Sequence, residues 1–325
     1  SLHDALPIYQ RSQRAADARG EPPAGQELRP LQARFSYGPK QILLDRVRIG
    51  QPGNVMLDGS GQFDRLGTNG RLVLNSTTAS FGQLATAVAP FAPSVAARLN
   101  ALGTGPGPVR ATFTLDLGKS KAPADRTSAQ VSLELDAPQQ IKGHATMTAT
   151  PSSAAVRGVD LDALLRSEFG LEAKLSAEQG RALIALLGLD RTLAAGDGPA
   201  QFEASLTGAA RAPLQVKAKI SGTGVDGDVE GTLEPWPQEP KVGLNLRVRS
   251  ADLRPLLDLK SSNLPLNDVR ATSRLTLAGG KLTFDDLDSL VAGSRLRGRV
   301  VLTTGEDRSI EGEIGLDQVT LAPMF

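Results

Sequence analysis

Cysteine is absent from the 325-residue chain, and histidine occurs only twice. These absences exclude disulfide bonds, thiolate metal sites and cysteine nucleophiles, and they leave too few imidazoles for a multi-histidine metal site. Lys and Arg number 36 against 35 Asp and Glu, so the basic excess of a nucleic-acid-binding surface is also missing. No apolar run approaches the ~20 residues of a membrane span. We therefore expect no metal, no cofactor and no nucleic-acid partner.

Aromatic side chains are scarce, with one Trp, two Tyr and nine Phe, whereas glycine is abundant at 34 residues. Glycine thus makes up about a tenth of the chain, against a usual ~7%. Few aromatics argue against a densely filled compact core. This composition is typical of many short strands and turns built around small aliphatic side chains.

Strict alternation of apolar and polar residues dominates from Leu31 onward, as in Val109–Leu117, Val131–Leu135 and Val242–Val248. Alternation with a period of two places the apolar side chains on one face of a sheet and the polar ones on the other. The pattern predicts a mainly β fold. It does not distinguish an open sheet from a closed sandwich or barrel.

A repeated unit organises these strands. It starts with a glycine, which we expect at the beginning of a strand, continues through two strands and ends at a short hydrophobic corner. The four repeat glycines are Gly61, Gly143, Gly231 and Gly298, and the corners are 81–84, 161–164, 253–256 and 321–324. Self-similarity of this kind is the signature of a repeat architecture. We predict four units at about 31–102, 109–189, 199–260 and 268–325.

Two insertions between the strands have helical character. Ser176–Gln179 has the form of a capping box, and the helix that follows presents Leu183 on its apolar face and ends at Gly188. The apolar stretch 81–102 contains Pro90 and Pro93, which predict that it is broken into short helices.

Residue patterns with possible chemistry favour structural roles. Gly222–Gly227 has the spacing of a dinucleotide-binding loop, but a strand follows it instead of a helix, so we predict a hairpin turn. The Asp285–Asp288 cluster lacks the ligand spacing of a calcium loop and is expected to lie in solvent at turns or edges. His144 lies on the polar side of a strand, where a surface position is expected.

The two ends of the chain lack the features of natural termini. Residues 1–8 match a translated sequencing adapter, and we expect them to be an artefact. Residues 9–30 are polar and read as a linker. The other end of the sequence, at the corner 321–324, stops inside the repeat pattern. We expect an internal fragment of a longer protein, with the repeat region 31–325 truncated at both ends.

The segment from Leu275 to Leu302, followed by Ile310–Leu316 and a corner, resembles the recurrent unit of the AsmA family, which includes TamB-like periplasmic repeat proteins. Asp226–Leu233 through Leu253–Leu257 provides a second instance. The resemblance covers roughly residues 31 to 325, and it rests on the order and repetition of degenerate motifs.

The resemblance implies an elongated, bent antiparallel β-sheet groove built from repeats, with short helical insertions. It also implies a periplasmic protein that is anchored to the inner membrane by an N-terminal helix missing from this sequence. Members of this family are associated with outer-membrane biogenesis and with phospholipid movement between the inner and outer membranes. The partners it implies are phospholipid acyl chains, the inner membrane and possible outer-membrane protein clients.

Three functions remain open at this point. The first is a non-enzymatic groove that holds or conducts phospholipid acyl chains. Burying an acyl chain in such a groove would contribute ~0.8 kcal/mol per CH₂ group. The second is an assembly scaffold that pairs its sheet edges with strands of outer-membrane proteins. The third is an enzyme, for which Asp285–Asp288 would be the one candidate catalytic cluster, and we expect the protein not to be an enzyme.

The candidate groove residues are the apolar members of the alternating runs. They are Leu115, Leu117, Leu133, Leu135, Leu244, Leu246, Leu275, Leu277, Leu282, Phe284, Val300, Leu302, Ile314 and Leu316.

Overall fold

The computed structural model describes most of the chain from Leu31 to Asp317. The described residues are 31–50, 55–89, 93–102, 108–119, 126–138, 140–158, 167–209, 212–235, 240–257, 268–291, 293–303 and 309–317. The predictions for residues 1–8 and 9–30, and for the corners at 161–164 and 321–324, lie outside them.

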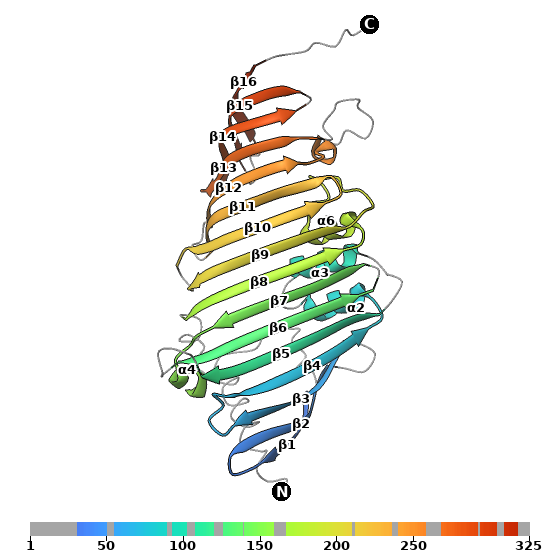
Figure 1. The fold of residues 1–325 in the computed structure, drawn as a ribbon, viewed down its shortest axis with the longest axis vertical. Coiled ribbons are helices and arrows are strands. Elements are labelled where there is room, and N and C mark those ends of the chain that lie inside the picture. Colours follow the sequence, from blue (N-terminus) through green and yellow to red (C-terminus); the bar gives the residue numbers. More distant parts are fainter. Residues whose placement is uncertain are drawn as a thin grey trace, which may run out of the picture.

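Sixteen strands form one antiparallel sheet in which every strand pairs with the next along the chain (Figure 1). The strands are β1 (Leu31–Tyr37), β2 (Gln41–Gly50), β3 (Met56–Asp64), β4 (Gly70–Thr78), β5 (Val109–Lys119), β6 (Thr127–Ala137), β7 (Ile141–Ala149), β8 (Glu168–Ala177), β9 (Ala200–Ala209), β10 (Leu214–Gly222), β11 (Val225–Glu234), β12 (Lys241–Ser250), β13 (Arg270–Ala278), β14 (Lys281–Val291), β15 (Ser294–Thr303) and β16 (Ser309–Leu316).

The sheet is open. Among the described residues, β1 and β16 each pair with a single neighbouring strand and not with one another. The expected fold class, a mainly β, elongated and bent antiparallel sheet with short helical insertions, is confirmed. The open sheet also decides between the alternatives that alternation alone left unresolved, since a sandwich or barrel would require a second or a closed sheet.

Short helices interrupt the strand order at its connections. They are α2 (Phe81–Val88), α3 (Pro93–Ala101), α4 (Ser153–Gly158), α6 (Gly180–Leu187) and the 3₁₀ turn η1 (Arg254–Leu257). Local sequence explains their ends: the Ser80 hydroxyl accepts a hydrogen bond from the Gln83 amide, and Gly188 ends α6 in a left-handed conformation. The break near Pro93 is confirmed, since α3 begins at that residue.

One detail of the helix prediction is wrong. Ser176 lies inside β8, and α6 is preceded by Gln179, whose side chain makes no capping hydrogen bond. The strand continues through Ala177 because that residue pairs with both Ile141 and Ala200 in the neighbouring strands. Ladder hydrogen bonds on both sides therefore outweigh the local capping signal.

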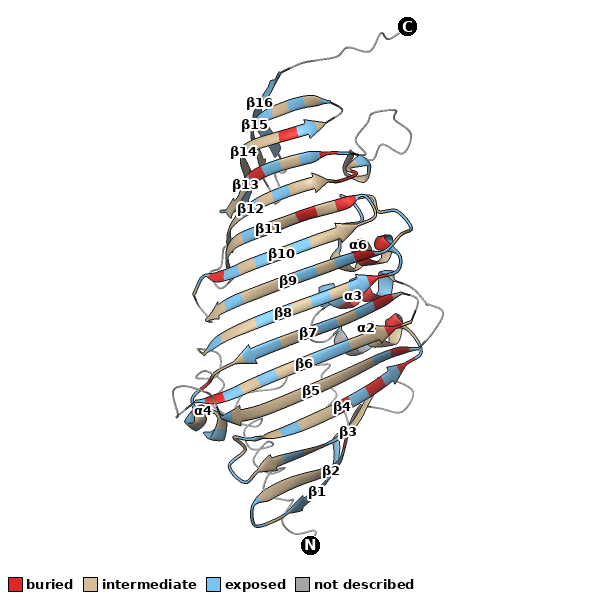
Figure 2. Ribbon diagram, in the orientation of Figure 1, coloured by how far each residue is buried: buried red, intermediate tan, exposed pale blue. Residues whose placement is uncertain are grey.

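The fully buried core lies along one margin of the sheet. Phe81 and Ala85 of α2, Leu99 of α3 and Leu183 of α6 pack against Ile141 and its cross-strand neighbours. Figure 2 shows buried residues gathered at the strand ends beside these helices, whereas the strand centres alternate between partly buried and exposed positions. α2, α3 and α6 thus cover one margin, α4 lies at the other, and the middle of the sheet has no helical layer among the described residues.

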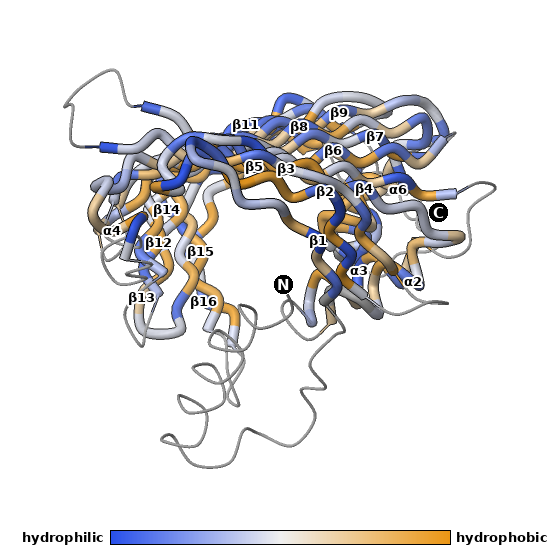
Figure 3. Tube along the Cα trace, turned by 90° about the horizontal axis from the view of Figure 1, so that it is seen from below, coloured by the Kyte–Doolittle hydropathy of each residue, from blue (hydrophilic) through white to orange (hydrophobic). Residues whose placement is uncertain are grey.

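Viewed along the stack of strands, the sheet curves as an arch with α2, α3 and α6 on its underside (Figure 3). These helices pack on the apolar side chains Leu135, Leu175 and Phe202. The apolar face is therefore the concave one, which we call the inner face. The opposite, convex face is called the outer face.

Repeat glycines lie where the backbone is most constrained. Gly231 and Gly298 adopt φ angles of 154° and 159°, a region that favours glycine. A methyl group at Gly231 would collide with the Gly243 carbonyl and approach the Leu244 Cα to 2.9 Å. The expected position at the start of a strand is wrong for Gly61, Gly231 and Gly298, which lie inside β3, β11 and β15. Because neighbouring strands approach these glycines closely, the glycines belong to bends within strands.

Replacing Gly231 with alanine is predicted to lower the free energy of unfolding by about 1 to 3 kcal/mol, because the substitution adds both backbone strain and a clash with the adjacent strand. Equilibrium urea unfolding measures the effect. Gly243→Ala on the neighbouring strand is the matched control, since its methyl group would meet only the Thr232 hydroxyl at 3.5 Å. Equal losses for the two variants would contradict the constraint at Gly231.

Candidate binding surface on the inner face

Cross-strand register gathers the inner-face side chains into four rows that run perpendicular to the strands. Row 2 crosses all sixteen strands and holds only apolar or glycine residues. Its members are Phe35, Leu44, Gly61, Leu72, Leu115, Val131, Met147, Leu171, Leu206, Val216, Gly231, Leu244, Leu275, Phe284, Val300 and Gly312.

Row 1 lies two residues away, on the side opposite α2, α3 and α6. It runs through Tyr37, Ile42, Phe63, Gly70, Leu117, Ala129, Ala149, Phe169 and Gly208, and then through Leu214, Leu233, Val242, Leu277, Leu282, Leu302 and Ile310. Gly208 and Leu214 connect its two parts, since a methyl group on Gly208 would sit 3.3 Å from the Leu214 Cα.

Rows 3 and 4 lie on the helix side of row 2. Row 3 runs through Ala33, Val47, Gly59, Leu74, Phe113, Leu133, Ala145, Ala173, Ala204, Ala218, Val229, Leu246 and Ser273, and resumes after a bulge at Leu287, Gly298 and Ile314. Row 4 runs through Ser76, Ala111, Leu135, Gly143, Leu175, Phe202, Ile220, Gly227, Val248, Ala271, Ser289, Leu296 and Leu316.

All fourteen candidate groove residues lie on this face. Row 1 contains Leu117, Leu277, Leu282 and Leu302; row 2 contains Leu115, Leu244, Leu275, Phe284 and Val300; row 3 contains Leu133, Leu246 and Ile314; row 4 contains Leu135 and Leu316. The repeat glycines Gly61, Gly143, Gly231 and Gly298 lie on the same face.

Sequence reasoning missed the centre of the surface. Met147, Leu171, Leu206 and Val216 continue row 2 through β7 to β10, between the residues that were selected. Their own strands alternate as well, but with alanine, serine and threonine at many positions. The difference in hydrophobicity between the two faces of these strands is therefore small in the sequence. The cross-strand register shows that the four residues belong to row 2.

The inner face is large for an exposed apolar surface. With strands ~4.8 Å apart and same-face residues ~6.7 Å apart, sixteen strands and four rows cover roughly 70 Å by 20 Å. The geometric area of this face is about 1,400 Å², of which the positions at Val47, Leu74 and Leu214 are buried and part of row 4 is covered by helices. The largest apolar patch of an ordinary monomer is about 300–600 Å². Leu133 and Met147, in the middle of the sheet, are each 44% exposed. A surface of this size and composition is typical of a binding site for an apolar ligand or partner.

Helices make the two margins of this surface unlike each other. Row 4 is walled by α2, α3 and α6 at β6 to β9, where Leu135, Leu175 and Phe202 pack against the helical cluster. Row 3 carries four successive alanines there, Ala145, Ala173, Ala204 and Ala218. The helices therefore border a floor of small side chains, with the larger residues of row 2 on its other side.

The outer face carries the charges in cross-strand ion pairs. Arg71 and Asp116 lie 3.4 Å apart, as do Lys174 and Glu203, while Arg299 and Asp285 lie 2.9 Å apart. Hydrogen bonds from arginine hold the pKa of the Asp58, Asp226 and Asp288 carboxyls below the ordinary value. Such exposed pairs contribute little to stability, but they balance the charge and keep this face polar.

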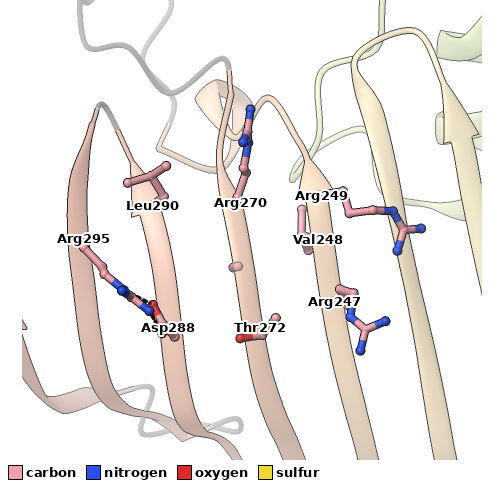
Figure 4. Close-up of a pocket in the computed structure, with 9 residues that line it drawn as sticks. Arg247, Val248, Arg249, Arg270, Thr272, Asp288, Leu290 and Arg295 are labelled. Atoms are coloured by element: carbon pink, nitrogen blue, oxygen red, sulfur yellow. Dashed lines mark hydrogen bonds and ion pairs between the residues drawn. The ribbon is translucent and has the colours of Figure 1, made fainter.

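A hollow of about 540 Å³ over β12 to β15 is lined by four arginines, Arg247, Arg249, Arg270 and Arg295. Figure 4 shows Arg295 meeting Asp288, whereas Arg249 is directed toward the neighbouring strand β11, where it pairs with Asp226 and Asp228. Because carboxylates pair with Arg249, Arg270 and Arg295, the hollow belongs to the ion-paired surface.

The other patterns with possible chemistry have structural roles here. Gly222 pairs with Val225 across the turn at Thr223 and Gly224, so the predicted hairpin is confirmed. His144 is exposed beside Glu134, as expected for a surface position. The placement of Asp285–Asp288 at turns or edges is wrong, because these residues form a bulge inside β14 and its carboxylates pair with arginines of β15.

Comparisons of this chain with family models, with curated proteins and with solved structures give no match. Within the part of the chain that the structure describes, no three His, Cys, Asp or Glu side chains gather closely enough to hold a metal ion. No helix of that part has the length and hydrophobicity needed to span a bilayer. The inner face is thus the feature from which a function can be argued.

Asp252 lies after β12 and pairs with Ala194 in the connection that follows α6. Its ionisation makes the stability of this corner depend on pH. Its carboxylate accepts hydrogen bonds from the Arg254 guanidinium and from the Arg254 amide at 3.1 Å, which lower its pKa. A lowered pKa stabilises the fold above the unfolded value of ~3.9, and that stabilisation is lost as the pH falls through the folded value.

We therefore expect Asp252→Asn to unfold at lower urea concentration than the wild type at pH 7. The difference between the two urea midpoints should shrink as the pH falls below about 4. The wild-type carboxyl is then protonated, first in the unfolded chain and at lower pH in the folded chain, and its charge no longer stabilises the fold. Urea midpoints between pH 7 and pH 3 measure it. A difference that stays constant over this range would show that the ionised carboxylate is not the stabilising group.

Proposed function

We propose that the protein holds or conducts phospholipid acyl chains along the inner face of its sheet. The observation that supports this is row 2, which crosses sixteen strands without a single polar side chain. An acyl chain laid along row 2 would meet only apolar side chains and glycines at any position between β1 and β16. Each CH₂ group transferred from water contributes about 0.8 kcal/mol, so even a short contact is favourable.

The shape of the surface suits a chain-like ligand. An open arch gives a linear molecule access along its whole length, whereas a closed core would exclude it. Small side chains at Ala145, Ala173 and Ala204 keep the floor low beside the helical wall. The charged outer face keeps the back of the sheet in water.

The setting of this activity comes from the AsmA resemblance alone. It places the protein in the periplasm, anchored to the inner membrane by a segment outside this sequence, where it would serve outer-membrane biogenesis without enzymatic chemistry. Partners on this proposal are phospholipids of the two membranes.

Met147 tests the proposal at the centre of row 2. Met147→Glu is expected to weaken binding of a fluorescent fatty-acid probe by roughly tenfold or more, because a carboxylate would lose its hydration against an acyl chain. Retention of phospholipid by the purified protein, counted by native mass spectrometry, should fall in parallel. The side chain is 44% exposed, so the fold should survive.

The matched control is Thr148→Glu, which adds the same charge to the adjacent exposed residue on the outer face. This variant should bind the probe like the wild type, and Met147→Leu should do so too. If both glutamate variants bind equally well, the inner face does not hold the acyl chain.

Leu246→Glu extends the test to row 3 in β12. We expect loss of phospholipid transfer between donor and acceptor vesicles while the circular dichroism spectrum stays that of the wild type. Transfer at the wild-type rate would remove Leu246 from the path of the lipid.

An assembly scaffold for outer-membrane proteins is the second candidate function. It is favoured by β16, whose eight residues are all exposed and whose outer edge has no partner strand among the described residues. Co-purification of unfolded barrel proteins with no bound lipid would support this scaffold in place of the lipid groove.

A further inference from the structure

The two edge strands carry charges of opposite sign. Neither β1 nor β16 contains a lysine or proline, but β1 carries Arg34 and β16 carries Glu311 and Glu313, which oppose pairing with a strand of like charge. Their inner-face side chains are exposed, with Phe35 at 55%, Ile314 at 53% and Ile310 at 78%. Each strand thus offers a row of backbone groups together with uncovered apolar side chains.

The two edges match each other in direction. Neighbouring strands are antiparallel and the sheet has sixteen of them, so β1 and β16 run in opposite directions. If a second copy in the same orientation extends the sheet, its β1 therefore lies antiparallel to β16 of the first copy. All four rows then continue across the junction: Gly312 falls opposite Phe35, Ile314 opposite Ala33, Ile310 opposite Tyr37 and Leu316 opposite Leu31. The glycine leaves room for the aromatic ring.

The outer-face charges match in the same register. Glu313 falls directly opposite Arg34, while Glu311 falls opposite Ser36 and Gly315 opposite Gln32. Arg34 and Glu313 are both exposed, and neither has an ion-pair partner within the described part of the chain. A junction in this register therefore adds an acid–base pair of the kind that recurs across the outer face, as at Lys174 and Glu203.

Symmetric pairings lack this match. Two copies of β16 that keep their apolar residues on one face oppose Glu313 with Glu313, Glu311 or Gly315, and never with a basic residue. Two copies of β1 oppose Arg34 with Arg34, Gln32 or Ser36, and never with an acidic residue. Like charges directly opposite one another are destabilising, so the edges favour one another over themselves.

We propose that copies of this chain associate head to tail, with β16 of one copy pairing antiparallel with β1 of the next around a Glu313–Arg34 ion pair. The contact is heterologous, so it leaves a free β16 and a free β1 at the ends of each assembly and produces open chains of copies. The inner-face rows run on through the junction. This association does not depend on the proposed lipid function and is measured without lipid.

The test is the molar mass of the full chain by light scattering over a range of concentrations. The wild type should form a series of multiples of the protomer, and Arg34→Glu or Glu313→Arg alone should weaken association by roughly tenfold, since each opposes like charges. In an equimolar mixture of these two variants, both junctions between unlike copies pair an acidic with a basic residue, so alternating copies should associate like the wild type. The double variant should also associate like the wild type. Thr148→Glu, far from either edge, should associate like the wild type.

Cysteine cross-linking reports the register directly, because the chain contains no other cysteine. Ile314→Cys and Ala33→Cys placed in the same chain should form disulfides between copies under mild oxidation, whereas Gly315→Cys with Ala33→Cys should not. A protomer mass at every concentration would overturn the proposal. So would cross-linking of Ile314→Cys alone, which indicates symmetric pairing, or charge reversals that leave the mass distribution unchanged.

Discussion

Register is the constraint on which this structure depends. In an antiparallel sheet the side-chain period is two, so a one-residue shift between strands would send every apolar side chain of one strand to the opposite face. Sixteen strands keep the alignment, even where bulges interrupt the ladders at β2–β3 and β14–β15. The four apolar rows, the charged outer face and the matched edges all follow from that alignment. Glycines such as Gly231 allow the strands to bend without losing it.

An arch that is apolar inside and ion-paired outside is an unusual arrangement for a folded chain, because most sheets cover an apolar face with a second layer. Here α2, α3 and α6 cover one margin, where Phe81 and Leu183 are almost fully buried. The rest of the concave face relies on its curvature and on aliphatic side chains of moderate size. The few aromatic residues are not kept away from this face, since its rows include Phe35, Phe63, Phe113, Phe169, Phe202 and Phe284.

Alternation in the sequence predicts the strands, their faces and a mainly β fold, whereas the elongated, bent sheet is expected from the resemblance to the AsmA family. The fourteen selected residues share one face because the period of two is a local property. Local sequence could not give the non-local features. β8 ends after Ala177 because this residue pairs with strands on both sides. The bulge in β14 places the Asp285 carboxylate beside Arg299. Openness of the sheet depends on β1 and β16 remaining apart, which no local pattern encodes.

The most direct measurement of the central claim maps where an acyl chain touches the protein. A phospholipid with a photoreactive group at the end of its acyl chain is bound to the full chain, irradiated, and the adducts are located by mass spectrometry. The account predicts adducts at inner-face positions such as Leu115, Met147 and Leu244, spread over several strands. Adducts confined to outer-face positions such as Gln130 and Thr148, or no adducts at all, would contradict it.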